Sequence, residues 1–449
     1  MGSEKGGNRS GQAIGQAVGQ AVGQAIGQAI GREYLFVQLR SWLIIAGRVS
    51  ALPILAMAFA LTLGAVVIYA AGYSPSLAYE AVWQSTFGSK VYFADTLVKT
   101  VPLIFTGVAV AIAFRGSVFN IGAEGQFLMG ALAASWAGVA LGGLPGPLPL
   151  LSVLLIGLVA GGLFGALAGF LKARLGVSEV ISTIMLNYVA MRLVGFAVTG
   201  PLKEVGGANP QTARIAPNAM LGIIVQGTRL HWGFFLALLV AVLAYYLLFK
   251  TTFGFEVQAV GYNPVAAGCS GINISRNIVL TMFLSGGLAG LGGAVELSGV
   301  SYRLYEAFSP GYGYDAIAIA LLAGNNPVGV LFTSFLFGAL RSGSNMMQRS
   351  AGISSVFVYV FQALVVFFVA AFAVRRPAAM RSFRARVYRL IRRTVVKTSA
   401  SAVTAESKSG NVSTSGSSAD DDNHTGDTGG GRPISKVNAS GSSAGGCKR

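Results

Sequence analysis

The sequence predicts an all-α polytopic membrane protein. Of its 449 residues, 53% are hydrophobic and only 11% are charged, and the mean hydropathy is +0.63, which is too apolar for a soluble globule. Several apolar runs reach the length of about 20 residues that a helix needs to cross roughly 30 Å of hydrocarbon. These runs are continuous and do not alternate with polar residues, which favours helices over a transmembrane β-barrel.

The charge pattern indicates membrane topology. The formal net charge is +17, but much of the basic excess lies beside apolar runs, as the positive-inside rule predicts, and does not indicate a nucleic-acid site. Two cysteines, Cys269 and Cys447, provide no disulfide framework. We expect both cysteines to face a reducing cytoplasm.

The amino-terminal part differs from the rest. Residues 11–31 repeat the unit GQAI or GQAV five times, and a glycine in every unit costs about 1 kcal/mol relative to alanine in a helix. We therefore interpret residues 1–49 as a low-complexity cytoplasmic extension. The transmembrane domain is expected over residues 50–375.

The first span is expected over residues 51–71. Three arginines precede it, which places the amino terminus in the cytoplasm. Residues 72–100 carry both charge signs and are predicted to form an external loop. The run 101–114 then returns inward and ends at Arg115.

A polar break interrupts the next apolar stretch. Asn120, Glu124 and Gln126 lie within seven residues and precede the apolar run 128–141. Such groups are costly at membrane depth, so they are expected to face a cavity or the bundle interior. The alternative is that Glu124 and Gln126 cap the start of a helix at the membrane interface.

Three further spans are expected over residues 150–171, 180–198 and 232–249. Asn187 lies within the second of them, where it could face a substrate or hydrogen-bond to a neighbouring helix. The segment 200–231 between the second and third spans is predicted to be external.

A hydrophilic stretch over residues 253–272 contains the pattern of a short helix. Asn263 is a capping residue, Pro264 suits the first helical position, Ala266 and Ala267 are small, and Gly271 is a stop signal. Basic residues flank the stretch on both sides, which places it on the cytoplasmic surface. A smooth helix there is suited to docking a soluble partner.

The following span, residues 277–300, contains glycines at three- and four-residue steps. Small residues at this spacing let helix backbones approach closely. We therefore assign helix packing, and not phosphate binding, to Gly286, Gly290 and Gly293.

The last part of the membrane domain contains two runs that are too short to cross alone, 314–323 and 328–340. A turn with Asn325 and Asn326 separates them, an arrangement typical of the discontinuous helices that line transport sites. With a final span over 353–374, about ten crossings or partial crossings are expected, and the carboxyl end returns to the cytoplasm. A basic amphipathic segment (376–397) suited to anionic lipid and a disordered cytoplasmic tail (398–449) complete the chain.

Five stretches together resemble one protein family. They are the helix over 263–271, with its Ala-Ala-xxx-Gly spacing, and the segments FRGSVFNIGAEGQFLMGA, SEVISTIMLNYVA, SGGLAGLGGAVE and GYGYDAIAIALLAGNNPVG. This set is similar to the permease subunits of bacterial nucleoside and simple-sugar ABC importers, which are related to ribose and branched-chain amino-acid permeases. The resemblance covers roughly the middle three quarters of the chain. It departs from the family at Val265, where the family's docking motif has a glutamate.

The resemblance implies a type II importer in the bacterial cytoplasmic (inner) membrane. Two permease subunits, identical or homologous, would sit on two ABC ATPase subunits, and an extracytoplasmic substrate-binding protein, possibly a lipoprotein, would deliver the ligand. The chain has no GxxxxGK[ST] loop, so ATP and magnesium would bind the partner ATPase. We expect no catalytic residue, metal or cofactor on this chain. The residues expected to couple to the ATPase are Gly261, Asn263, Pro264, Ala266, Ala267 and Gly271.

The substrate path needs hydrogen-bonding groups at membrane depth, because a nucleoside or sugar is polar. The side chains predicted to supply them are Asn120, Glu124, Gln126, Asn187, Asn325 and Asn326. An alternative is a secondary transporter driven by an ion gradient, with Glu124 as the proton or sodium site. A passive channel is a third possibility, but the sequence has no filter motif. Nucleosides, sugars and flavin-like molecules all remain open as ligands.

Overall fold

The computed structural model describes residue 59, residues 61–354, and residues 357, 359–360, 362–364 and 367–368. In this part of the chain every regular element is a helix, and the only strand pairing consists of isolated bridges. The predicted extension 1–49, the basic segment 376–397 and the tail 398–449 lie outside it. In chain order, the elements are α2 (Pro75–Phe87), α3 (Lys90–Arg115), α4 (Ala123–Ala140), α5 (Leu148–Leu175), α6 (Glu179–Thr199), η1 (Pro217–Ala219), α7 (Gly233–Lys250), α8 (Thr252–Tyr262), α9 (Pro264–Cys269), α10 (Ile274–Glu296), the π-helical turn η2 (Leu297–Ser301), α11 (Tyr312–Leu322) and α12 (Pro327–Ala351).

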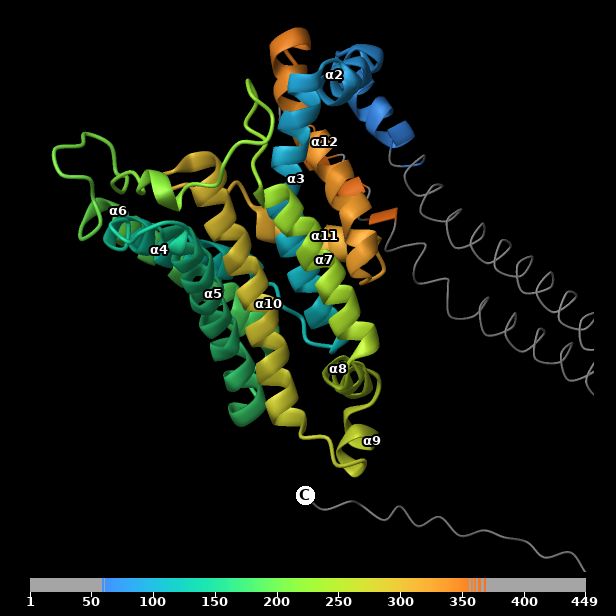
Figure 1. Cartoon of the computed structure of the whole chain (residues 1–449). Coiled ribbons are helices and arrows are strands. Elements are labelled where there is room, and N and C mark those ends of the chain that lie inside the picture. Colours follow the sequence, from blue (N-terminus) through green and yellow to red (C-terminus); the bar gives the residue numbers. More distant parts are fainter. Residues whose placement is uncertain are drawn as a thin grey trace, which may run out of the picture. The chain divides into compact units, whose positions relative to one another are not determined.

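Five of these elements are long and apolar enough to cross a membrane. They are α3, α5, α6, α7, and α10 together with η2. The prediction of an all-helical polytopic protein is confirmed for the described residues (Figure 1). The predicted first and last spans are described only in part, the first as the helical stretch Leu61–Ala70.

The predicted external loop over residues 72–100 is wrong. Most of it forms α2 and the first turns of α3, which is 26 residues long. The hydroxyl of Ser89 caps α3 by accepting a hydrogen bond from the Tyr92 amide. The charges that suggested a loop satisfy each other on the helix, because Lys99 Nζ lies 2.7 Å from Asp95 Oδ2 one turn away.

The hydrophilic stretch 253–272 contains one more helix than predicted. Thr251 caps α8 by accepting from the Gly254 amide at 3.2 Å. Asn263 then caps α9 by accepting from the Ala266 amide at 3.1 Å. The expected short helix therefore forms, and Gly271 follows it with φ 86°, a left-handed conformation that glycine adopts without strain.

Of the two short runs predicted near the end of the membrane domain, 314–323 and 328–340, the first is confirmed as short and the second is not. α11 has 11 residues, in line with the expected partial crossing. The second run is not short, since α12 has 25 residues and continues past Leu340 through Arg341. The charge of Arg341 ended the apolar run in the sequence but does not end the helix, because Asp315 of α11 offsets it.

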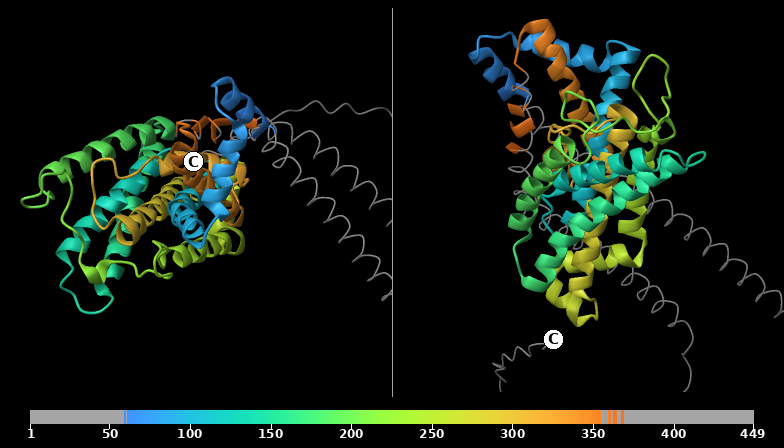
Figure 2. Two further views of the ribbon diagram at one scale, coloured as in Figure 1. Left: turned by 90° about the horizontal axis from the view of Figure 1, so that it is seen from above. Right: turned by 90° about the vertical axis from the view of Figure 1, so that its left-hand side faces the viewer.

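Helix α10 is the packing centre of the bundle, and it contacts α5, α4 and α3 (Figures 1 and 2). A β-carbon at Gly286 would lie 2.3 Å from the Gly161 carbonyl oxygen, and one at Gly290 would lie 2.4 Å from that of Gly157. One at Gly293 would lie 2.1 Å from the Phe127 carbonyl oxygen. The backbones of α5, α4 and α10 therefore approach more closely than any side chain on α10 would allow.

We call the two ends of the bundle the α9 end and the loop end. The α9 end holds α8, α9 and the turn between α11 and α12. The loop end holds residues 200–232 and 302–311, joined by hydrogen bonds such as Thr212 N–H to the Leu304 carbonyl at 2.9 Å. Helix α10 begins just after α9 and continues into η2. At η2, the Ser298 carbonyl accepts a hydrogen bond from the Leu221 amide of the loop end. The two ends of the bundle are therefore separated by the length of α10.

Candidate functional site

A buried polar network lies midway along α10. Asn120, in the connection between α3 and α4, donates through Nδ2 to Gln126 Oε1 and to Ser285 Oγ, both at 2.8 Å. Gln126 returns a hydrogen bond of 3.0 Å to Asn120 Oδ1, and Ser285 donates to the Ala109 carbonyl at 2.6 Å. All three polar side chains are buried. The network therefore anchors the α3–α4 connection to α10.

Two further predicted residues extend this network to α6 and α11. Asn187 accepts from the Gly125 amide at 2.8 Å and donates to the Ile121 carbonyl at 2.9 Å. Glu124 accepts from the Gly313 amide at 2.7 Å. Asn120, Glu124 and Gln126 therefore lie in the interior of the bundle, one of the two positions expected from the sequence. Asn187 hydrogen-bonds to the neighbouring helix α4.

Asn325 and Asn326 lie apart from the network, at the α9 end. The Asn326 side chain caps α12 by accepting from the Val328 amide at 3.0 Å. The Asn325 backbone carbonyl accepts from Arg115 Nε at 2.9 Å. The six residues predicted for the substrate path thus form two separate groups, four in the middle of the bundle and two at one end.

The α9 end contains a junction between three chain segments, the end of α3, α8 and the turn between α11 and α12. We call it the Arg115 junction (Arg115, Ser117, Gly261 and Asn325). Ser117 Oγ donates to the Gly261 carbonyl at 2.7 Å. A β-carbon at Gly261 would lie 2.1 Å from the Arg115 carbonyl oxygen, and the Arg115 guanidinium lies 5.3 Å from the centre of the Phe249 ring. Helix α8 is thus packed directly on the end of α3.

The residues of α9 divide into an outward and an inward set. Asn263, Pro264 and Ala266 are exposed, whereas Ala267 is buried. Val265 between them is 72% exposed. The exposed side of α9 is therefore small and uncharged.

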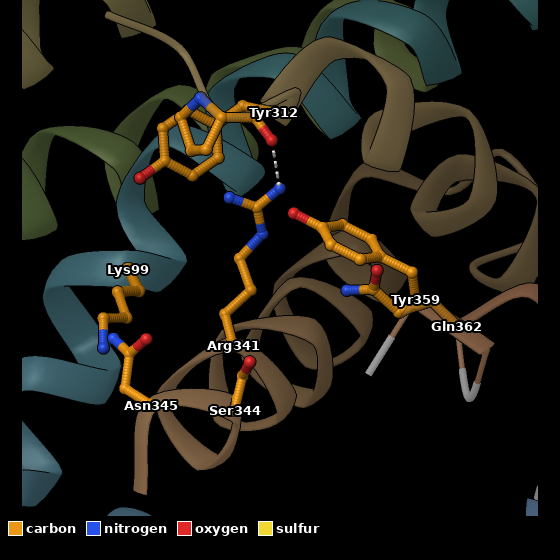
Figure 3. Close-up of a pocket in the computed structure, with 8 residues that line it drawn as sticks. Lys99, Tyr312, Arg341, Ser344, Asn345, Tyr359 and Gln362 are labelled. Atoms are coloured by element: carbon orange, nitrogen blue, oxygen red, sulfur yellow. Dashed lines mark hydrogen bonds between the residues drawn. The ribbon is translucent and has the colours of Figure 1, made fainter. Parts of the chain in front are cut away.

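Sequence reasoning missed a polar cavity beside α12, which we call the α12 cavity (Figure 3). Its volume is about 260 Å³, and its lining consists of Lys99, Pro310, Tyr312, Arg341, Ser344, Asn345, Tyr359 and Gln362. Arg341 donates through Nε and Nη2 to Asp315 Oδ2 at 3.0 and 2.8 Å, and through Nη2 to the Pro310 carbonyl at 3.0 Å. The sequence does contain an indication of this site. Asp315 and Arg341 lie in or beside neighbouring apolar runs, and opposite charges within membranes usually pair.

The network and the α12 cavity meet at the first turn of α11. Tyr312 lines the cavity, with its ring centre 4.7 Å from the Arg341 guanidinium carbon. The next residue, Gly313, holds Glu124 through its amide and packs so closely on α4 that a β-carbon would lie 2.1 Å from the Glu124 nitrogen. A movement of α11 would therefore change both sites.

Two titratable groups at the loop end have shifted pKa values. The hydrogen bond from Arg303 holds the pKa of Glu204 below its ordinary range. Burial lowers the pKa of His231 to about 4, so this side chain is neutral at pH 7 and its Nδ1 accepts from the Gly233 amide at 3.2 Å. Within the described helices and loops, His, Cys, Asp and Glu do not gather in the threes that would hold a metal ion.

A bundle of apolar spanning helices around buried, hydrogen-bonded polar groups and a polar cavity defines the class of polytopic membrane transport proteins. Residues 92–370 match the family described as branched-chain amino acid transport system / permease component. The chain therefore belongs to this permease family of the cell membrane.

Three relatives match over most of their length. The guanosine ABC transporter permease protein NupP of Bacillus subtilis is 39% identical over 330 residues, which cover 72% of this chain and 94% of the relative. The nucleoside ABC transporter permease protein NupB of Lactococcus lactis is 36% identical over 327 residues (71% and 90%). The glucose ABC transporter permease protein TsgB13 of Haloferax volcanii is 35% identical over 327 residues (71% and 86%).

Proposed function

We propose that this chain is the permease subunit of an ABC importer and forms the path for a nucleoside. The observation that carries the proposal is the identity of 39% with a guanosine permease over 94% of that relative. A simple sugar is the second candidate substrate, because a glucose permease is 35% identical over a similar length.

In this proposal α9 is the coupling helix that docks on an ABC ATPase. Three observations support this role: α9 is exposed, its outward side chains are small, and it follows α8, which packs on the Arg115 junction. Docking would use Asn263, Pro264, Ala266 and Gly271, whereas the buried Ala267 and the tightly packed Gly261 would hold the helix in place. Because the chain has no phosphate-binding GxxxxGK[ST] loop, ATP hydrolysis falls to the partner.

The proposed orientation puts the α9 end in the cytoplasm and the loop end outside. Lys250 and Arg276 flank α8 and α9, which supports this orientation through the positive-inside rule. Labelling of Cys269, an exposed residue at the end of α9, tests it in a Cys447→Ser background. An impermeant maleimide should label inverted vesicles and spare intact cells, and labelling of intact cells would overturn the orientation.

The remaining partners follow from the importer class. A second permease, homologous or identical, would complete the path, and a substrate-binding protein, possibly lipid-anchored, would deliver ligand at the loop end. At that end, the two loops joined by the Glu204–Arg303 ion pair would form the docking surface for the binding protein. The polar network would contribute to the substrate path through residues Asn120, Glu124, Gln126 and Asn187.

The experiment that tests this function is uptake of tritiated guanosine by cells that express the chain with its ATPase, second permease and binding protein. We expect uptake to disappear when the ATPase lacks its phosphate-binding lysine and to survive a protonophore. The reverse result would support the ion-driven alternative, in which Glu124 carries the ion. Uptake of labelled glucose but not of tritiated guanosine by the same cells would favour the sugar.

A further inference from the structure

We propose that the α12 cavity is a binding subsite for an uncharged, planar ligand rich in hydrogen-bond acceptors. The inference rests on the proposed importer function and deepens it, because it gives the ligand a place and a charge. The subsite differs from the substrate path predicted from the sequence. Its lining comes from α3, the start of α11, α12 and residues 359 and 362, and not from the polar network.

The first observation is an unpaired donor. Gln362 is only 5% exposed, and its Nε2 has no hydrogen-bond partner among the described residues. A buried amide without a partner destabilises the folded protein, because it has given up its hydrogen bonds to water. Figure 3 shows this amide beside Tyr359, on the side of the cavity that faces Arg341. An acceptor on a ligand in the cavity would remove this cost.

The second observation is charge balance. Each cation of the cavity has a carboxylate partner: Arg341 lies 2.8 Å from Asp315, and Lys99 lies 2.7 Å from Asp95. The cavity therefore has no surplus positive charge for a phosphate or carboxylate, and burying an anion there would cost more than burying a neutral molecule.

The third observation is the shape and aromatic character of the lining. Tyr312 and Tyr359 contribute rings to the wall, and aromatic rings stack with nucleobases. Arginine and amide groups recognise the carbonyl and ring-nitrogen acceptors of a purine. The volume of about 260 Å³ lies just below the range of drug-sized ligand pockets, about 300–1,000 Å³, which suits a small ligand. The size and the lining of the cavity therefore suit one molecule about as large as a nucleoside.

The first test removes the unpaired donor. Gln362→Leu is compared with Ser334→Ala, which also removes a buried unpaired polar atom but lies outside the cavity. We measure equilibrium binding of tritiated guanosine to the assembled permease–ATPase complex in nanodiscs. Gln362→Leu should weaken binding by about three- to tenfold, the effect of one lost hydrogen bond, while Tm stays equal or rises. Ser334→Ala should bind like the unsubstituted complex.

The second test changes the charge of the cavity. Asp95→Asn leaves Lys99 without its carboxylate and should let guanosine 5′-monophosphate displace tritiated guanosine at a severalfold lower concentration. Glu80→Gln is the matched control, because Glu80 of α2 pairs with Gln84 and does not line the cavity. It should leave displacement by the monophosphate unchanged.

The outcomes separate this subsite from the importer function. Equal guanosine binding in Gln362→Leu and Ser334→Ala, together with unchanged displacement in Asp95→Asn, would overturn the subsite and leave the importer assignment standing. If the unsubstituted complex neither binds nor takes up guanosine, the nucleoside assignment and the subsite are both wrong.

Discussion

Arg115 Nε donates a hydrogen bond of 2.9 Å to the backbone carbonyl of Asn325, and this contact joins the end of α3 to the turn between α11 and α12. Gly261 of α8 packs on the same point, with its carbonyl held by Ser117. From this turn, α11 leads back to Tyr312 and the α12 cavity. A chain of packed contacts therefore connects α8 and α9 with the α12 cavity. We expect a displacement of α8 and α9 to be transmitted to the cavity along these contacts.

The Arg115 junction should determine how well ATP hydrolysis is coupled to uptake. Arg115→Gln removes the contacts with Gly324, Asn325 and Phe249. Substitutions along such routes change coupling by about 0.5–2 kcal/mol, so the substrate imported per ATP hydrolysed should fall severalfold. The control is Arg174→Gln, which removes the same charge from an exposed position on α5. Equal coupling ratios in the two variants would contradict a role for the junction.

The close approach of α10 to α5 should not tolerate a single methyl group. In Gly290→Ala the new carbon would lie 2.4 Å from the Gly157 carbonyl oxygen, and overpacking of this kind costs about 1–3 kcal/mol. Thermal unfolding of the detergent-solubilised protein should show a lower Tm. Gly195→Ala is the control, because its nearest atom would be 3.7 Å away. A Tm for Gly290→Ala equal to that of Gly195→Ala would mean that the helices are not in contact there.

Asn187 should contribute to stability as well as to transport. Asn187→Leu leaves the Gly125 amide and the Ile121 carbonyl without their partner, and each buried unpaired group costs about 1–3 kcal/mol. The Tm should therefore fall, whereas Asn218→Leu, at an exposed position of η1, should leave it unchanged. A Tm for Asn187→Leu equal to that of Asn218→Leu would contradict the role of Asn187 in stability.

His231 should make the loop end sensitive to acid. Its pKa is lowered from 6.5 to about 4 by burial, so between these values the unfolded chain binds the proton and the folded protein does not. The stabilisation is complete above pH 6.5 and is lost as the pH falls, by about 3 kcal/mol at pH 4. His231→Asn keeps an acceptor for the Gly233 amide and removes the titration. A loss of Tm between pH 7 and pH 5 that is as large in this variant would refute the assignment.

The sequence predicted local features that one segment determines by itself. The cap at Asn263, the proline at the first turn of α9 and the glycine after it act within nine residues, so the helix could be located without the fold. The spacing of Gly286, Gly290 and Gly293 likewise predicted close helix packing, and the family resemblance was carried by contiguous motifs.

Features that need two distant segments could not be predicted in the same way. The charges around Lys99 were interpreted as part of an external loop, and the predicted apolar run 328–340 stopped before Arg341, because the partners Asp95 and Asp315 can be placed only on the folded helices. For this reason the first turns of α3 were assigned to a loop, α12 was cut short and the α12 cavity was overlooked. The six polar residues of the predicted path were grouped by residue type, and the fold separates Asn325 and Asn326 from the others.

The central claim is that α9 docks the ATPase, and co-purification tests it most directly. Ala266 is exposed in the middle of α9, so Ala266→Trp adds bulk to the docking surface without disturbing the bundle, and Ala266→Ser is the matched small substitution. Both variants should insert into the membrane in equal amounts. We predict that the ATPase co-purifies with Ala266→Ser and is lost from Ala266→Trp, and retention of a full complement of ATPase by Ala266→Trp would contradict the account.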